Sequence, residues 1–333
     1  MARPSVQPGA VIDGFTIGEC VYHGGMATLW SVSRPGIAVP LLMKIPRMSE
    51  GEDPAAIVSF EMEQMILPRL SGPHVPRCFG TGDFARQAYV VMERIPGKTL
   101  YSRLGELPLA YEEASAITGK IALALADLHR QNVVHHDIKP SSIMFLPGGE
   151  AVLIDFGLSH HNHLPDLLQE EFRLPYGTAP YMAPERLLGV RDDPRSDLFS
   201  LGVLLYFFTT GERPFGESET LRGMRRRLWR DPYPPRKLRP DYPPWLQENR
   251  VAVPGDRAGV APAHGIAAGI RACSPRPGQT DRTLGAAQAR SLELRAAPAL
   301  QSRADAPESK IRSRGPTGLR SDRGRRARSC GRI

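Results

Sequence analysis

No phenylalanine, tyrosine or tryptophan follows Trp245 in this chain of 333 residues. The segment 249–333 is rich in Ala, Arg, Gly, Pro and Ser, and a long stretch without aromatic side chains has little apolar surface to bury. We therefore expect residues 249–333 to form a disordered tail. This feature confines the packed core to the first 248 residues, which suffice for one two-lobed domain or two small domains.

The positive charge of the chain is concentrated in the same tail. Residues 249–333 contain 17 Lys and Arg against 6 Asp and Glu, a net charge of +11. Because the whole chain has a formal net charge of +8, residues 1–248 carry a net charge of −3. A main body this close to neutrality indicates no polyanion partner, so we expect no nucleic-acid binding by the folded domain.

Cysteine usage and hydropathy favour a cytoplasmic protein. The four cysteines are Cys20, Cys78, Cys273 and Cys330. They lack metal-ligand spacing and suit a reducing compartment better than a disulfide framework. The longest apolar run, Leu198–Thr210, is too short to span a bilayer, and the residues after Met1 lack the apolar core of a signal peptide. The sequence thus predicts a cytoplasmic chain without a membrane segment, and it leaves the oligomeric state open.

The hydrophobic periodicity is strand-like in the first part of the chain and mainly helical afterwards. Alternation and turn residues predict strands at Phe15–Ile17, Leu29–Val32, Pro40–Ile45, Arg77–Phe79 and Ala88–Met92, and later at Ile143–Leu146 and Ala151–Ile154. Apolar residues three or four positions apart predict helices at 54–70, Tyr111–Arg130 and Asp197–Thr210. A β-rich half followed by a mainly helical half indicates an α+β fold with two lobes.

Five short motifs occur in a fixed order along these elements. They are Gly24-Gly25 between two strands, Lys44 at a strand end, His135-His136-Asp137-Ile138-Lys139-Pro140 after the long helix, Asp155-Phe156-Gly157 after a strand, and Ala183-Pro184-Glu185. In this order and context they resemble the eukaryotic-like (Hanks-type) serine/threonine protein kinases, of the kind also found in bacteria. The resemblance implies a kinase domain over residues 10–248, with an N-lobe at about 10–95 and a C-lobe at about 96–248.

The resemblance implies an ATP site made of a glycine-containing flap, a strand lysine and a hinge. The flap residues would be Val21, Tyr22, His23, Gly24, Gly25, Met26, Ala27, Thr28 and Leu29. Lys44 would hold the α- and β-phosphates, and the backbone of Glu93 and Ile95 would bind the adenine edge. Taken alone, the glycine pair is equally consistent with a plain hairpin turn, and Lys44 with an edge residue whose ammonium reaches water.

Two glutamates of the helix predicted at 54–70 are candidates to pair with Lys44. Glu63 lies three residues from both Phe60 and Ile66, so it falls on the apolar stripe, whereas Glu61 is offset toward solvent. A carboxylate on a buried stripe needs a partner because burying it alone is costly. We therefore predict that Glu63 pairs with Lys44.

The remaining motifs supply the chemistry that the resemblance implies. Asp137 would orient the hydroxyl of a protein serine or threonine, and Lys139 would neutralise charge on the transferred phosphoryl group. Asp155 and Ser142 would bind Mg²⁺, which accompanies ATP. Asp197 would anchor the backbone of the catalytic loop, although Ser-Asp at this position also fits a plain helix N-cap.

Several positions depart from the family pattern. Tyr22 and Ala27 stand where flap glycines are usual, and Leu42 replaces a small residue above the adenine. His136 replaces the arginine of His-Arg-Asp, and Ser142 replaces an asparagine. These changes keep open the alternative of a nucleotide-binding pseudokinase that acts as a signalling scaffold. A small-molecule phosphotransferase is disfavoured by Gly177–Pro180 and Ala183–Glu185, the family's peptide-docking segments.

The histidine at position 136 also bears on regulation. In many kinases the arginine there binds a phosphate on the activation loop and orders that loop. Between Gly157 and Thr178 this chain has only Ser159 and Tyr176 as hydroxyl-bearing residues. The receptor arginine and the usual phosphate acceptor are both missing, so we expect a loop that needs no phosphorylation.

The resemblance ends near Glu248, where the family continues with further C-lobe helices. We interpret this as an apparently truncated C-lobe, followed either by an out-of-frame translation of GC-rich sequence or by a natural disordered basic tail. Truncation predicts that Glu185 lacks its usual arginine partner. It also predicts exposure of large apolar side chains on the helix at Asp197–Thr210, namely Leu201, Leu204, Leu205 and Phe208.

Overall fold

The computed structural model describes residues 6–47, 54–172, 175–217, 220–228 and 230–247. All of them belong to one compact unit, Met1–Gln279. The predicted tail at 249–333 and the predicted end of the C-lobe after Gln247 lie outside the described residues. Of the helices that the structure describes, none combines the length and apolar character needed to cross a membrane.

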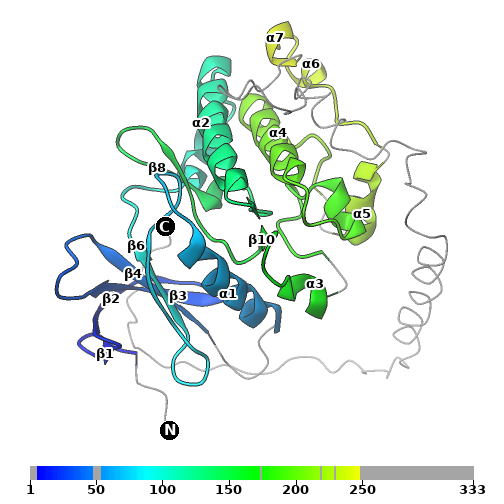
Figure 1. Cartoon of the computed structure of the whole chain (residues 1–333). Helices are drawn as coiled ribbons and strands as arrows, with labels where there is room; N and C mark the ends of the chain where they lie inside the picture. The colour runs from blue at the N-terminus through cyan, green and yellow to red at the C-terminus, as the bar shows by residue number, and fades with distance from the viewer. Residues whose placement is uncertain (1–5, 48–53, 173–174, 218–219, 229, 248–333) are drawn as a thin grey trace, which may run out of the picture. The chain divides into compact units, whose positions relative to one another are not determined.

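The first lobe is a six-stranded antiparallel sheet with one helix, as Figure 1 shows in blue to cyan. The strands are β1 (Val11–Ile12), β2 (Phe15–His23), β3 (Ala27–Ser33), β4 (Leu41–Pro46), β5 (Cys78–Gly82) and β6 (Tyr89–Glu93), in the spatial order β1-β2-β3-β4-β6-β5. Helix α1 (Pro54–Ile66) continues into a short 3₁₀ turn at Leu67–Arg69 and contacts β4 and β6. The predicted strands and helix are therefore confirmed, with each strand of the flap hairpin longer than predicted.

Alternation along β4 decides which side chains reach the interior of the site. Leu41, Met43 and Ile45 are buried in a small core on one face of the sheet. Because successive side chains of a strand point to opposite faces, Leu42 and Lys44 lie on the other face. Lys44 therefore lies on the opposite face of the sheet from Met43 and Ile45, although these apolar residues flank it in the sequence.

The second lobe is mainly helical, with α2 (Tyr111–Arg130) packed beside α4 (Arg195–Thr210) (Figure 1). Two small antiparallel pairs join β7 (Val133–Val134) to β10 (His160–His161) and β8 (Ile143–Phe145) to β9 (Ala151–Leu153). The shorter helices are α3 (Leu167–Glu171), α5 (Leu221–Arg225), α6 (Pro235–Leu238) and α7 (Pro244–Gln247). The remaining 3₁₀ segments are Leu100–Glu106, Pro140–Ser142, Pro184–Leu188 and Arg226–Leu228. This arrangement confirms the α+β, two-lobed prediction.

The predicted exposure of apolar side chains on α4 is wrong. Leu201, Leu204, Leu205 and Phe208 are between 0% and 6% exposed. They share one core with α2 and with Tyr242 and Leu246, which come from the last described residues. The prediction failed because it assigned the covering role to helices beyond residue 248.

The stretch that follows α5 is held against the C-terminal half of α4 by hydrogen bonds as well. The Tyr206 hydroxyl donates to the carbonyl of Tyr233 at 2.8 Å, and the Tyr242 hydroxyl lies 3.0 Å from Thr209 Oγ1. Arg239 donates to the Thr209 carbonyl at 3.1 Å. These contacts explain how residues up to Gln247 bury the end of α4.

Candidate active site

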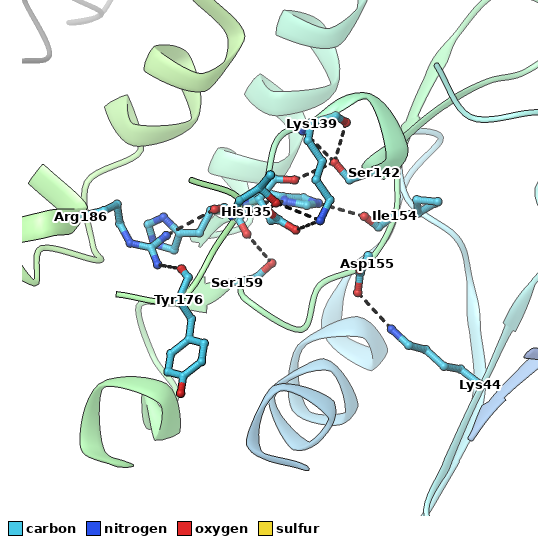
Figure 2. A network of polar contacts seen from close by, with 12 residues as sticks. Lys44, His135, Lys139, Ser142, Ile154, Asp155, Ser159, Tyr176 and Arg186 are labelled. Atoms are coloured by element: carbon cyan, nitrogen blue, oxygen red, sulfur yellow. Dashed lines mark hydrogen bonds and ion pairs between the residues drawn. The ribbon is translucent and has the colours of Figure 1, made fainter. Parts of the chain in front are cut away.

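Lys44 on β4 and Glu63 on α1 form the ion pair that the apolar stripe predicted. Lys44 Nζ lies 2.6 Å from Glu63 Oε2, and the Glu63 side chain is 2% exposed. Glu61, the rejected candidate, is exposed. The same Lys44 ammonium lies 3.0 Å from Asp155 Oδ1, so one cation joins the two lobes (Figure 2).

The electrostatics of this trio keep Lys44 and Asp155 charged, whereas burial raises the pKa of the Glu63 carboxyl above its ordinary value. The Lys44 ammonium lowers the pKa of the Asp155 carboxyl to about 2. Burial disfavours the charge of Lys44, but the carboxylates of Asp155 and Glu63 outweigh it and raise the pKa of the ammonium. Lys44 therefore remains a cation and Asp155 an anion throughout the physiological range.

Asp137 and Lys139 on the catalytic loop meet Thr178 from the segment before Ala183-Pro184-Glu185. Lys139 Nζ lies 2.5 Å from Asp137 Oδ2 and donates to Thr178 Oγ1 at 3.1 Å. The Thr178 hydroxyl donates to Asp137 Oδ1 at 2.7 Å. The Thr178 amide also donates to Oδ1, at 3.3 Å. Asp137 is 6% exposed, and the contacts on both of its oxygens fix the orientation of the carboxylate.

Thr178 in direct contact with Asp137 is a site residue that sequence analysis did not single out. It was noted only as part of a docking segment at Gly177–Pro180. The Thr178 hydroxyl donates a hydrogen bond to Asp137 Oδ1. A serine or threonine substrate would present the same kind of hydroxyl to this oxygen. A Gly-Thr pair shortly before the Ala-Pro-Glu motif was the available signal.

The carboxylate of Asp197 at the start of α4 holds the backbone of the catalytic loop. Its Oδ2 accepts from the His135 amide and its Oδ1 from the His136 amide, both at 2.8 Å. Oδ2 also lies 2.9 Å from His129 Nε2 on α2. No side chain caps α4, whose N-cap is Pro194, so the alternative of a plain helix cap is wrong and the predicted anchor is confirmed.

Backbone strain occurs on both sides of this site. His136 has a φ of 66° and Asp155 a φ of 70°, in the left-handed region that non-glycine residues rarely adopt. Such residues cost about 1–3 kcal/mol each and persist only where their surroundings hold them. Here the Asp197 carboxylate holds the His136 amide, and Lys44 holds the Asp155 side chain.

The two predicted metal ligands are placed differently. The Asp155 side chain is 47% exposed, whereas Ser142 is fully buried. The Ser142 hydroxyl lies 2.7 Å from the Asp137 carbonyl and 3.0 Å from the Lys139 carbonyl, and it accepts from the Lys139 amide at 3.1 Å (Figure 2). Of the two, Asp155 is the one whose carboxylate is open to solvent.

This donor set fits Mg²⁺ bound together with a nucleotide. Within the described part of the chain, no group of three or more His, Cys, Asp or Glu side chains could hold a metal ion. Magnesium is usually held by one or two carboxylates together with waters and substrate phosphates, and not by a cage of protein ligands. An exposed, ionised Asp155 beside a cationic lysine matches that mode.

The predicted flap is a tight turn between β2 and β3. The Gly24 amide donates to the Ala27 carbonyl at 3.0 Å, and Arg47 donates to the Gly24 carbonyl at 3.1 Å. A Cβ on Gly24 would lie 2.7 Å from the Tyr22 ring and 3.1 Å from the Ala27 carbonyl oxygen, so a larger residue at position 24 would displace the exposed Tyr22 side chain. The hairpin turn and the flap are thus the same structure.

The predicted hinge follows directly from the sheet. Glu93 ends β6, and its amide donates to the Arg77 carbonyl at 2.9 Å. The Arg94 amide donates to the Pro40 carbonyl at 2.8 Å, and Ile95 comes next. Leu42, predicted above the adenine, pairs in register with Met92 and therefore lies beside this hinge.

The protein kinase domain family matches residues 41–244 of this chain. The chain belongs to that family. The match spans Lys44, Glu63, the catalytic loop and Asp155, and it begins after the flap hairpin. The predicted resemblance to protein kinases is therefore confirmed.

Curated relatives are bacterial serine/threonine kinases by name. Serine/threonine-protein kinase PknA of Mycobacterium tuberculosis is 30% identical over 253 residues, covering 73% of this chain and 57% of PknA. Serine/threonine-protein kinase PknB of Mycolicibacterium smegmatis is 28% identical over 244 residues, covering 72% of this chain and 39% of PknB. The chain thus spans between about a third and three-fifths of the length of these relatives.

Proposed function

We propose that this chain is an ATP- and Mg²⁺-dependent protein kinase that phosphorylates serine and threonine residues of other proteins. The catalytic domain corresponds to residues 10–248, of which the family match covers 41–244. The bacterial relatives named as serine/threonine kinases support this activity. The cytoplasm is the proposed location, in keeping with Cys20 and Cys78 being free thiols in the described residues.

Each group in the site has a role in phosphoryl transfer. Lys44, fixed by Glu63, binds the α- and β-phosphates, and the flap at Val21–Leu29 covers the triphosphate. The hinge backbone at Glu93 and Ile95 binds the adenine edge. Magnesium, when bound, would neutralise charge on the phosphates, and Asp155 would hold it.

The remaining residues act on the incoming hydroxyl. Asp137 Oδ1 accepts a hydroxyl hydrogen bond from Thr178 and would accept that of the substrate in the same way. Lys139, 2.5 Å from Asp137, would balance the charge that develops on the transferred group. Ser142 contributes by closing the loop between Asp137 and Lys139.

The observation that carries the proposal is the cluster of Asp137, Lys139 and Thr178. It combines a buried, oriented carboxylate, a cation in contact with it and a hydroxyl already seated on the carboxylate. A pseudokinase that only binds nucleotide needs none of these three contacts. The Lys44, Glu63 and Asp155 trio would serve binding in either case.

The test is transfer of labelled phosphate from Mg-ATP to dephosphorylated casein, with phosphoamino-acid analysis of the product. Asp137→Asn should lower turnover by about 10²–10⁴-fold, the usual contribution of an orienting base, while ATP affinity changes little. Asp83→Asn is the matched control, because Asp83 is an exposed residue of the turn between β5 and β6 and its carboxylate accepts only from the Arg86 amide among the hydrogen bonds of the described residues.

The outcomes separate the two hypotheses. Phosphoserine and phosphothreonine made by the wild type and lost in Asp137→Asn support the kinase. ATP binding by the wild type without any transfer would identify a pseudokinase. Near-wild-type turnover in Asp137→Asn would show that the catalytic loop has been assigned wrongly.

A further inference from the structure

The segment that follows Asp155-Phe156-Gly157 is tied down by a buried ion pair that no catalytic role requires. Asp166, the N-cap of α3, has its Oδ2 2.5 Å from Arg191 Nε and 3.0 Å from His160 Nδ1. Its Oδ1 accepts from the Gln169 amide at 3.2 Å. The Asp166 side chain is 10% exposed and that of Arg191 is 8% exposed.

Arg191 reaches the same segment at a second place. Its Nη2 donates to the carbonyl of Leu158 at 3.0 Å and lies 3.4 Å from that of Ser159. Arg191 belongs to the connection between the 3₁₀ segment Pro184–Leu188 and α4. One guanidinium therefore holds both the start of the segment and the cap of α3.

The residue at position 136 is linked to this guanidinium through the backbone. His136 Nε2 donates to the Arg191 carbonyl at 2.7 Å. Burial, together with the positive charges of Arg186 and Arg191, keeps the pKa of His136 well below its usual value. The imidazole is therefore neutral near pH 7 and supplies no cation to the segment.

A second arginine ties the far end of the segment to the catalytic loop. Arg186 is 2% exposed and donates to the Tyr176 carbonyl at 3.0 Å, with the His136 carbonyl 3.4 Å from its other nitrogen (Figure 2). Arg191 thus holds the start of the segment and Arg186 holds its end. Among the described residues of the segment, Asp166 is the only acidic side chain that contacts either arginine.

We propose that Asp166 is a built-in anion that, by pairing with Arg191, orders the activation segment in place of a phosphate. Segments of this kind are ordered in other kinases when an added phosphate pairs with arginine. Here the cation comes from position 191 and not from position 136, and the anion is encoded in the chain. Asp166 and Arg191 are positioning residues, since they hold the segment that precedes Thr178 and do not touch the reacting groups.

The charge state of Asp166 agrees with this role. Burial alone would favour the neutral acid, but the hydrogen bond from His160 and the charge of Arg191 hold the pKa of Asp166 below its usual range. Ser159, one of the two candidate phosphate acceptors, is poorly placed by comparison. The Ser159 hydroxyl is fully buried and lies 3.1 Å from the His135 carbonyl, so it could not be modified without opening the segment.

The test compares Asp166→Asn, Arg191→Met and the double variant in the full chain. Asparagine preserves size and helix capping and removes only the charge. The proposal rests on the kinase activity proposed above, so kinetics are paired with hydrogen exchange of residues 158–172, which needs no activity. Arg195→Gln is the control, because it removes an exposed ion pair with Asp193 on the same connection.

We expect Asp166→Asn to lower kcat by about tenfold or more, because small displacements of a catalytic constellation are costly, with KM for ATP changed less than about twofold. Hydrogen exchange in 158–172 should accelerate, with exchange in α2 unchanged. Asp166→Glu, which keeps the carboxylate, should recover much of the lost kcat. Phosphatase treatment should leave the wild-type rate unchanged.

Three results would overturn the proposal: wild-type kcat in Asp166→Asn, unchanged exchange in 158–172, or a tenfold loss of wild-type activity after phosphatase treatment. A wild type without transferase activity would refute the proposed function. In that case hydrogen exchange in residues 158–172 would by itself test whether the pair of Asp166 and Arg191 orders the segment. Should a single variant fail to fold, the double variant decides, because it leaves neither charge buried without a partner.

Discussion

Replacing Glu185 with glutamine is expected to stabilise this domain at neutral pH. Glu185 is 8% exposed, and its Oε1 accepts from the Ser196 hydroxyl at 2.8 Å. Its Oε2 is buried without a hydrogen-bond partner, and no arginine pairs with the side chain among the described residues. Burial raises the pKa of the carboxyl to about 6.

The magnitude follows from that pKa. A carboxyl whose pKa is higher in the folded state destabilises the fold wherever it is ionised. Below its ordinary pKa of 4.5 the group is protonated in both states and costs nothing. Between pH 4.5 and 6 the penalty grows. Above that range it stays near 2 kcal/mol, because the pKa rises from 4.5 to about 6 on folding and a tenfold change in a proton affinity corresponds to about 1.36 kcal/mol. Glutamine keeps the acceptor for Ser196 but buries an unpaired amide, so the gain should be about 1–2 kcal/mol.

The assay is urea unfolding of wild type and Glu185→Gln at pH 7.5 and at pH 5. The variant should be more stable at pH 7.5, and its advantage should shrink at pH 5, where more of the wild-type carboxyl is protonated. Glu61→Gln is the control, since Glu61 is exposed on α1 and its replacement should have no such pH dependence. A Glu185→Gln variant that is less stable than wild type at pH 7.5 would show that the carboxylate has a cationic partner, and the reasoning would fail.

Two further predictions concern the loops around the site. Ser159→Ala combined with Tyr176→Phe should leave kcat within about twofold of the wild type. The free energy of unfolding should fall by about 1–3 kcal/mol, because the His135 carbonyl loses the Ser159 hydroxyl as its hydrogen-bond donor. A tenfold loss of activity with unchanged stability would mean that one of the two hydroxyls acts as a switch. Asp197→Asn should lower the free energy of unfolding by about 1–3 kcal/mol, because the NH₂ group of the asparagine would face the backbone N–H of His135 or His136. The variant should also have a lower kcat. Thermal melts and initial rates measure the two effects, and a variant with wild-type stability and kcat would contradict the anchoring role of Asp197.

Patterns local in sequence were sufficient for the secondary structure and for part of the site. The stripe through Phe60 and Ile66 selected Glu63 over Glu61, because helix periodicity alone decides which side chain faces the core. The period of two along β4 placed Lys44 opposite the buried Met43 in the same way. The order of the motifs then identified Asp137, Lys139 and Asp155 as residues that the fold brings together.

Contacts between distant residues were beyond such patterns. Arg191 is separated from Asp166 by 25 residues and Thr178 from Asp137 by 41, and no periodicity links either pair. The Ser142 hydroxyl lies within hydrogen-bond distance of the Asp137 and Lys139 carbonyls of its own loop. The position of these carbonyls depends on the backbone conformation, so the residue types alone could not predict the contact.

The apolar stripe of α1 was sufficient to choose Glu63, and the motifs that resemble the kinase family were sufficient to name Lys44, Asp137 and Asp155. The residues that cover α4 and the contacts that hold the activation segment could be found only in the folded chain. Burial of Leu204 depends on Tyr242 and Leu246, and the charge of Asp166 depends on Arg191 and His160. In each case the free energy lies in packing or in charge pairing between segments that meet only after folding. For this reason the apparent truncation suggested an exposed face on α4, which the folded chain buries, and the sequence held no signal for the pairing of Asp166 with Arg191.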